Sequence, residues 1–206
     1  MELVEKTPFG MWNVKKREQE VMAMQTTYPG TTIETTSIYK GSTRVLFDGI
    51  FATGGITLSQ VSVMTGLEPY LIQNWVKRGF VSSPQKRVYS KDQFARIIII
   101  NMLRESLQIE RICGLIKVIA GPTDDSSDDL ISDSELYHLY VDMISDSELN
   151  FGKEQTVYAA ANNIAKDFAE SFPGARKKLV DILRAMVYAH AASKLRNFSE
   201  NILAEL

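Results

Sequence analysis

The spacing of hydrophobic and polar positions predicts that most of this chain is helical, and residues 57–79 show the pattern most clearly. In "TLSQVSVMTG", residues 57–66, aliphatic side chains recur every third residue behind Thr57, which is placed to cap a helix. The next segment, "EPYLIQNWVKRG", has Pro69 in its first turn and Gly79 at its end. The pattern predicts two short helices joined by a tight turn.

Further helices are predicted on both sides of this pair. "STRVLFDGIFATGG", residues 42–55, indicates a short apolar helix that two glycines end, and a helix that is apolar on more than one side is expected after Ser90. "LQIERICGLIKVIAGP", residues 107–122, predicts another helix. Three more helices are predicted at about residues 132–146, 153–171 and 175–203.

A short motif, "ISDSEL", occurs twice and resembles a helix start each time. In both copies a serine is followed three residues later by glutamate, which is the spacing of a capping box. The two pairs are Ser132 with Glu135 and Ser145 with Glu148. We interpret them as two helix N-termini and not as a structural repeat, which would need a longer period and more copies.

The predicted fold class is mainly α, and changes in composition divide the chain into four parts. Residues 1–42 are weakly patterned and Thr-rich, so irregular or extended structure is expected there. Residues 43–121 hold the paired helices and their neighbours, and residues 122–131 form an acidic linker. Residues 132–206 form an α-helical region that is expected to serve dimerisation or effector binding.

The net charge of −2 conceals an uneven distribution along the chain. Residues 56–121 carry nine Lys and Arg against four Asp and Glu, whereas residues 122–150 carry nine Asp and Glu and no Lys or Arg. Binding to phosphates needs a local basic surface and not a basic protein as a whole. The acidic overall balance therefore does not exclude a nucleic-acid partner for residues 56–121.

The second helix of the pair has a polar face whose side chains suit the major groove of DNA. Four residues at i, i+3, i+4 and i+7 share this face: Tyr70, Gln73, Asn74 and Lys77. Amide side chains match the edge of adenine, lysine can donate to guanine or to a phosphate, and tyrosine can reach a phosphate or stack. The opposite, apolar side is expected to pack on the first helix.

Basic and hydroxyl side chains around this face are candidates for phosphate contacts. Lys86 and Arg87 lie in "PQKR", a short connection where a wing would meet the DNA backbone, and Arg78 and Thr57 complete the set. A solvated amphipathic helix is the alternative interpretation of the polar face taken alone. The preceding helix, the turn, the basic connection and the local charge together favour DNA binding.

Motifs that extend over four consecutive elements support this interpretation. The matching positions are Thr65-Gly66, Pro69, Ile72, Trp75, Lys77-Arg78-Gly79, Arg87, Tyr89-Ser90 and Asp92. This set resembles the MerR-type winged helix. The segments "FATGGITLSQVS", "IQNWVKRG" and "INMLRESLQIERI" resemble more closely a bacterial family known as domain-of-unknown-function family 1836.

The resemblance covers about residues 43–150 and implies a MerR-like winged helix-turn-helix followed by an α-helical C-terminal region. It also implies a DNA-binding protein that acts as a transcription regulator on double-stranded DNA. Two features depart from the MerR pattern, because Gln73 stands where Arg is usual and the wing is short. An adaptor that uses the same scaffold on a protein partner is the alternative function.

Other kinds of chemistry have little support in the sequence. The single Cys113 excludes an intrachain disulfide and any multi-cysteine metal site, and His138 and His190 lack a partner at ligand spacing. "DDSSDDLISDSE", residues 124–135, partly matches a calcium loop, but Asp129 stands where that loop needs Gly, so an acidic linker is preferred. We therefore expect no enzyme activity, no cofactor and no metal.

Partners and location follow from the remaining patterns. No apolar run approaches the roughly 20 residues of a membrane helix, and the N-terminus lacks the pattern of a secretory signal, so a cytoplasmic protein is expected. Small residues in the last helix, Ala185 to Ala192, and Met186 favour close packing. Packing against residues 153–171 and a homodimer through the C-terminal helices are both open. The patterns identify neither an operator nor a small-molecule effector.

Overall fold

The computed structural model describes residues 26–120, 131–170 and 173–206. These residues contain eight helices, labelled α2 to α9, and four strands of two residues each. The mainly α fold class is therefore confirmed. Most of the acidic linker expected at 122–131 and of the N-terminal segment lies outside the described residues.

The described chain begins with a small hairpin that packs against α5 (Lys91–Leu103). Strand β1 (Thr26–Thr27) pairs antiparallel with β2 (Glu34–Thr35). Gly30, in the turn, has a φ of +75°, and a Cβ there would lie 2.5 Å from the carbonyl oxygen of Ile98. Only glycine permits both this backbone conformation and this close approach.

Helices α3 (Leu58–Thr65) and α4 (Pro69–Lys77) are the predicted pair. Thr57 caps α3, as the sequence predicts, and the structure adds a capping box with Gln60. Gly66 ends α3 in the left-handed conformation, with a φ of +69°. The apolar side of α4, which includes Ile72 and Trp75, is buried, so the polar face points outward.

After α4 the chain makes a tight turn between Gln85 and Val88, which is called the hairpin below and leads into strand β4 (Val88–Tyr89). Strand β3 (Ile56–Thr57) pairs antiparallel with β4, and Gln85 forms an additional bridge with Val88. This leaves Lys86 and Arg87 as a two-residue turn at the tip of the hairpin.

The remaining helices cover this module and continue its core. They are α2 (Ser42–Ile50), α5 (Lys91–Leu103), α6 (Ile109–Ala120), α7 (Asp133–Ile144), α8 (Glu154–Ala165) and α9 (Ala175–Ala204). Helix α5 lies at the centre, and the run from Ile97 to Ile100 is fully buried. One cluster of buried hydrophobic residues extends from Tyr28 to Ala189.

A buried ion pair joins α5 to the start of α7. The Arg96 guanidinium donates two hydrogen bonds to Asp133, and the shorter, from Nε, is 2.6 Å long. Both side chains are only 8% exposed. A bidentate pair of this kind fixes the position of one helix on the other, because removing either partner would leave a buried charge uncompensated.

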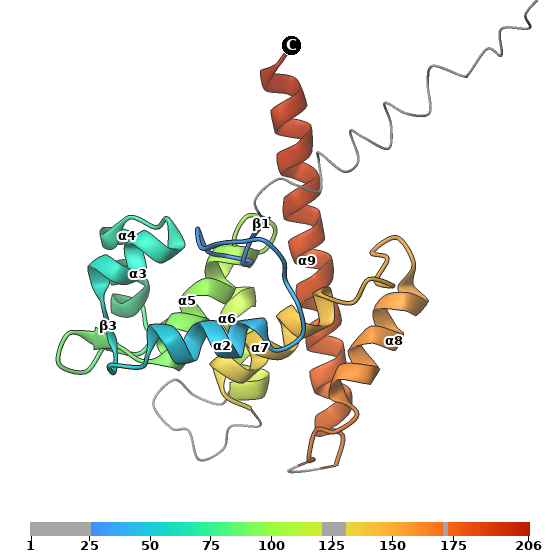
Figure 1. Cartoon of the computed structure of the whole chain (residues 1–206), viewed down its shortest axis with the longest axis horizontal. Helices are drawn as coiled ribbons and strands as arrows, with labels where there is room; N and C mark the ends of the chain where they lie inside the picture. The colour runs from blue at the N-terminus through green and yellow to red at the C-terminus, as the bar shows by residue number, and fades with distance from the viewer. Residues whose placement is uncertain (1–25, 121–130, 171–172) are drawn as a thin grey trace, which may run out of the picture.

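Helix α9 has an inner and an outer part. Met186 and Ala189 are buried within the chain, which agrees with the first of the two interpretations, intramolecular packing. These two residues therefore cannot form a dimer interface. Within the described chain, the hydrogen bonds of α9 with the body end at Arg196 and Asn197, which both donate to Glu105. The C-terminal part of α9 projects away from the other helices (Figure 1).

The motif that suggested two capping boxes behaves differently in its two copies. Ser132 caps α7, and its hydroxyl accepts a hydrogen bond from the Glu135 amide. Ser145 instead lies at the C-terminal end of the same helix, so the second predicted N-terminus is wrong. Helix α8 begins later, at Glu154.

No helix in the described ranges combines the length and the apolar character that crossing a membrane requires.

Candidate nucleic-acid interface

The polar face of α4 is exposed to solvent. Tyr70 is 70% exposed, and Gln73, Asn74 and Lys77 are exposed beside it. None of these four side chains forms a hydrogen bond or an ion pair with a residue that the structure describes. Their donors and acceptors are therefore satisfied by water in the free protein and can be transferred to a partner.

The hairpin tip has an unusual backbone conformation. Lys86 and Arg87 have φ angles of 50° and 67°, so both lie in the left-handed region. A two-residue hairpin loop of type I′ requires positive φ at both positions, and Asn-Gly is the common sequence there. Residues other than glycine cost roughly 1–2 kcal/mol each in this region. The chain therefore keeps two cations at the tip at a cost in stability.

Arg78 is held differently from the other basic residues of this region. Its Nη2 donates to Glu110 on α6 at 2.8 Å, and its guanidinium lies over the Phe80 ring at 4.4 Å from the centroid. Both partners of the ion pair are well exposed, so the pair adds at most about 1 kcal/mol. Arg78 is thus engaged within the free protein, in contrast to Lys77.

Thr57, the last of the predicted phosphate contacts, has its hydroxyl engaged in the cap of α3. Its Oγ1 accepts from the Gln60 amide and lies 3.0 Å from Gln60 Oε1. The residue is exposed, but a phosphate would have to compete with the cap for its side chain.

Ion pairs reduce the free positive charge that the sequence suggests, and three of the six cations without an ion-pair partner among the described residues lie on α4 and the hairpin. Three of the nine cations in residues 56–121 are paired, as Arg78–Glu110, Lys91–Asp48 and Arg96–Asp133. Lys77, Lys86 and Arg87 have no ion-pair partner among the described residues. No Asp or Glu occurs in the sequence from Pro69 to Lys91. The basic character of this surface therefore rests on α4 and the hairpin.

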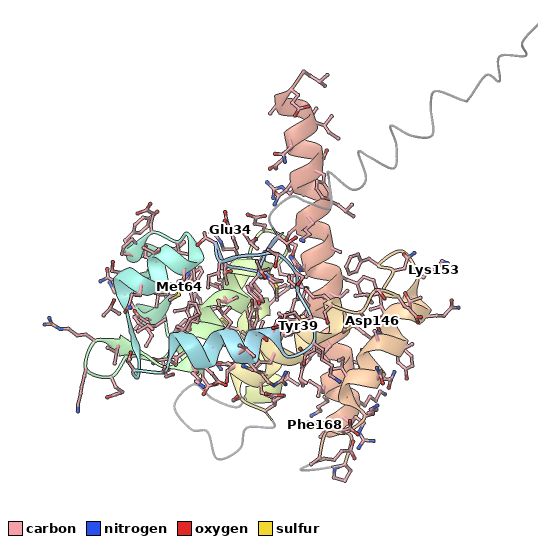
Figure 2. The ribbon with its side chains drawn as sticks, in the orientation of Figure 1. Glu34, Tyr39, Met64, Asp146, Lys153 and Phe168 are labelled. Carbon is pink, nitrogen blue, oxygen red and sulfur yellow. The ribbon has the colours of Figure 1, made fainter. Side chains whose placement is uncertain are left out.

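This surface lies at one end of the molecule. Helix α4 and the paired strands β3 and β4 are at the end opposite α8 and α9 (Figure 1). Figure 2 shows the same separation, with Met64 of α3 at one end and Lys153 and Phe168 at the other. The described C-terminal helices therefore leave the surface open.

The two histidines and the cysteine have structural surroundings. His138 Nδ1 lies 2.8 Å from Thr43 Oγ1, and His190 Nδ1 lies 2.5 Å from the Tyr140 hydroxyl. Burial lowers the pKa of each histidine from 6.5 to about 4. Burial also raises the pKa of the Cys113 thiol, which keeps it protonated and unreactive near neutral pH.

The residues of the calcium-loop pattern that the structure describes have other partners. Glu135 forms an ion pair with Arg44 at 2.5 Å, and Ser132 caps α7. The other three positions that matched, Asp124, Ser126 and Asp128, lie outside the described residues. Within the described ranges no group of three or more His, Cys, Asp or Glu side chains is placed to hold a metal ion.

Comparisons with known proteins give one match. No curated protein and no solved structure matches the chain. One family model matches part of the chain, from β3 into α7. This part contains α4, the hairpin and the Arg96–Asp133 pair but not α8 or α9. The predicted resemblance is confirmed at this level: residues 56–140 match the family described as domain of unknown function (DUF1836).

Proposed function

We propose that this chain binds double-stranded DNA and acts as a transcription regulator, with α3, α4 and the hairpin at Gln85–Val88 working as a MerR-like winged helix-turn-helix. Two observations together carry the proposal. The polar face of α4 is exposed, and two cations with no ion-pair partner among the described residues stand on a hairpin turn of strained backbone conformation. If this surface only faced solvent, Asn-Gly would form the same two-residue turn with less backbone strain than Lys86-Arg87.

The roles of the residues follow from their chemistry. Gln73 and Asn74 present paired donors and acceptors to base edges, and Tyr70 and Lys77 flank them on the same face of α4. Lys86 and Arg87 contact phosphates as the wing, which fixes the orientation of α4 in the groove. Arg78 joins the phosphate contacts by exchanging Glu110 for a phosphate, since the exposed pair is weak.

The proposed second partner is another copy of this chain, bound through the projecting end of α9. Leu195, Phe198 and Ile202 are each more than 60% exposed and are spaced by three and four residues, which is the spacing of a coiled-coil seam. Lys194 and Arg196 lie in the first turn of this projecting part of α9, and acidic residues lie closer to its C-terminus. An antiparallel pair would therefore place the basic start of each helix beside the acidic finish of the other.

Salt dependence of DNA binding tests the proposal and separates it from the adaptor alternative. Fluorescence anisotropy of a labelled random-sequence duplex should show affinity falling steeply with salt. Lys86→Gln/Arg87→Gln should lower the slope of log affinity against log salt by about 2, because each phosphate contact contributes about 0.9. Lys166→Gln/Lys177→Gln, a matched pair of exposed lysines directly after α8 and on α9, should leave the slope unchanged.

The adaptor alternative gains if the folded protein binds no duplex at low salt. A slope that changes equally in the two double variants would show that net charge alone drives binding, and the proposed interface would be wrong.

A further inference from the structure

A polar pocket lies where α9 leaves the body of the protein. Its volume is about 360 Å³, within the range of small-ligand sites. The lining comes from the β1–β2 turn, the end of α3, the end of α5 and α9. The side chains that matter below are Asn101, Arg104, Glu105, His190, Lys194 and Asn197.

The pocket contains cationic groups with spare hydrogen-bond donors. Arg104 uses its Nε to donate to Asn101 Oδ1 at 3.0 Å, and its two Nη groups have no partner among the described residues. Lys194 likewise has no hydrogen-bond or ion-pair partner in the described part of the chain. Glu105 is the single carboxylate among the lining residues, and its Oε2 already accepts from Asn197.

His190 adds a third donor, because the hydrogen bond with Tyr140 fixes its tautomer. The Tyr140 hydroxyl is buried, lies 2.5 Å from His190 Nδ1 and has no other partner among the described residues. Tyr140 must therefore donate to Nδ1 to satisfy its own hydrogen. A neutral His190 then carries its proton on Nε2. The lowered pKa of His190, due to burial and to nearby Lys194, keeps it neutral at pH 7.

The position of the pocket links the DNA-binding module to α9. Asn101 Nδ2 donates to the carbonyl oxygens of Gly30 and Thr65, both at 3.0 Å. These hydrogen bonds connect the β1–β2 hairpin to the end of α3 at the bottom of the pocket. Gly66, the turn between α3 and α4, lines one side, and Ser193 of α9 lines another. A molecule in the pocket would contact both the turn before α4 and helix α9.

We infer that this pocket binds a small anion, which it would hold through the Arg104 guanidinium, the Lys194 ammonium and the His190 Nε2–H. Donors converge on it from two helices, and carboxylate or phosphate oxygens are the groups that accept from such a set. The role of this anion as an effector rests on the proposed DNA binding. Anion binding itself does not, and it is measured without DNA.

Isothermal titration of the full-length chain with inorganic phosphate and with citrate, at constant ionic strength, tests the inference. At least one of the two should bind the wild type with a saturable isotherm at millimolar concentration. Arg104→Gln/Lys194→Gln should weaken this binding roughly tenfold or more, because charge-assisted hydrogen bonds are lost. Both residues have exposed side chains, and a circular dichroism spectrum checks that the variant is folded.

Two controls make the result decisive. Lys166→Gln/Lys177→Gln removes the same charge elsewhere and should bind as the wild type does, and Arg104→Lys should retain part of the affinity. The inference is overturned if neither anion binds the wild type, or if the two double variants lose affinity equally. Both outcomes are independent of whether the protein binds DNA.

Discussion

The two ends of this molecule are both exposed, but in opposite chemical ways. On the outward face of α4 the side chains are polar or cationic, and the apolar side of the helix is buried through Ile72 and Trp75. At the free end of α9 the outward side chains include Leu195, Phe198 and Ile202. Water satisfies the first surface, whereas it is a poor solvent for the second.

This difference indicates two kinds of partner. A polar, cationic face without acidic residues gains most from a polyanion, through phosphate contacts and base edges. An apolar stripe on a projecting helix gains most from burial against a similar stripe. Our proposal of DNA at one end and a second copy of the chain at the other rests on this contrast, and the predictions below test each end separately.

The largest effect is expected at the α9 end. Phe198→Asp/Ile202→Asp should abolish dimers, since burial of each apolar side chain contributes about 1.5–3 kcal/mol. Analytical ultracentrifugation at tens of micromolar measures the change. Ala204→Asp, on the opposite side of the helix, is the control and should remain dimeric. A wild-type chain that is monomeric at this concentration would remove the proposed partner.

A smaller effect is expected at the base-contacting face. Gln73→Ala and Asn74→Ala should each cost about 1–3 kcal/mol on a preferred duplex and should relax the base preference, with folding intact. Competition binding against random duplex measures both quantities. If neither substitution changes them, α4 is not the recognition helix.

The hairpin should show stability and binding changing in opposite directions. Lys86→Asn/Arg87→Gly supplies the residues that the turn favours and should stabilise the fold by about 1–2 kcal/mol. The same change should weaken DNA binding, because two phosphate contacts are lost. Urea unfolding and anisotropy measure the two effects. A variant that gains no stability would contradict the strain assigned to this turn.

The smallest effect concerns the buried region between the two ends. The folded protein holds the pKa of His138 and of His190 near 4, below the ordinary 6.5. As the pH is lowered from 7.5 to 5.5, the unfolded chain therefore takes up protons that the folded chain does not. The free energy of unfolding decreases as a result. The expected loss is about 1 kcal/mol for each histidine.

Urea unfolding at the two pH values measures this loss, and the variant His138→Gln/His190→Gln provides the comparison. The variant should lose less stability than the wild type over the same interval. Equal losses in the two proteins would mean that other groups cause the pH dependence.

Local chemistry made the helix pair predictable. Thr57, Pro69 and Gly79 are signals that act within a few residues, and α3 and α4 begin and end as these signals indicate. The repeated motif "ISDSEL" shows the limit of such signals. After its first copy come Tyr137 and other residues that the core buries, whereas the second copy leads into turns that include Gly152. A cap therefore starts a helix only where the following residues have a core to bury.

Non-local contacts account for what the sequence could not predict. Arg96 adds to the local basic count but is neutralised by Asp133, 37 residues away. The "PQKR" segment contains no Gly or Asn, so nothing in it indicates a two-residue hairpin turn. In α9 the periodicity runs through Ala189 and Leu195 alike, and only the tertiary structure separates the buried residue from the exposed one.

Selection of bound sequences from a random pool of duplex DNA tests the central claim most directly. The full-length chain should enrich a defined site, with two half-sites if α9 joins two copies, and Gln73→Ala/Asn74→Ala should lose that enrichment while remaining folded. A folded wild-type chain that enriches no sequence and retains no duplex at low salt would contradict the account and favour a protein partner for α4.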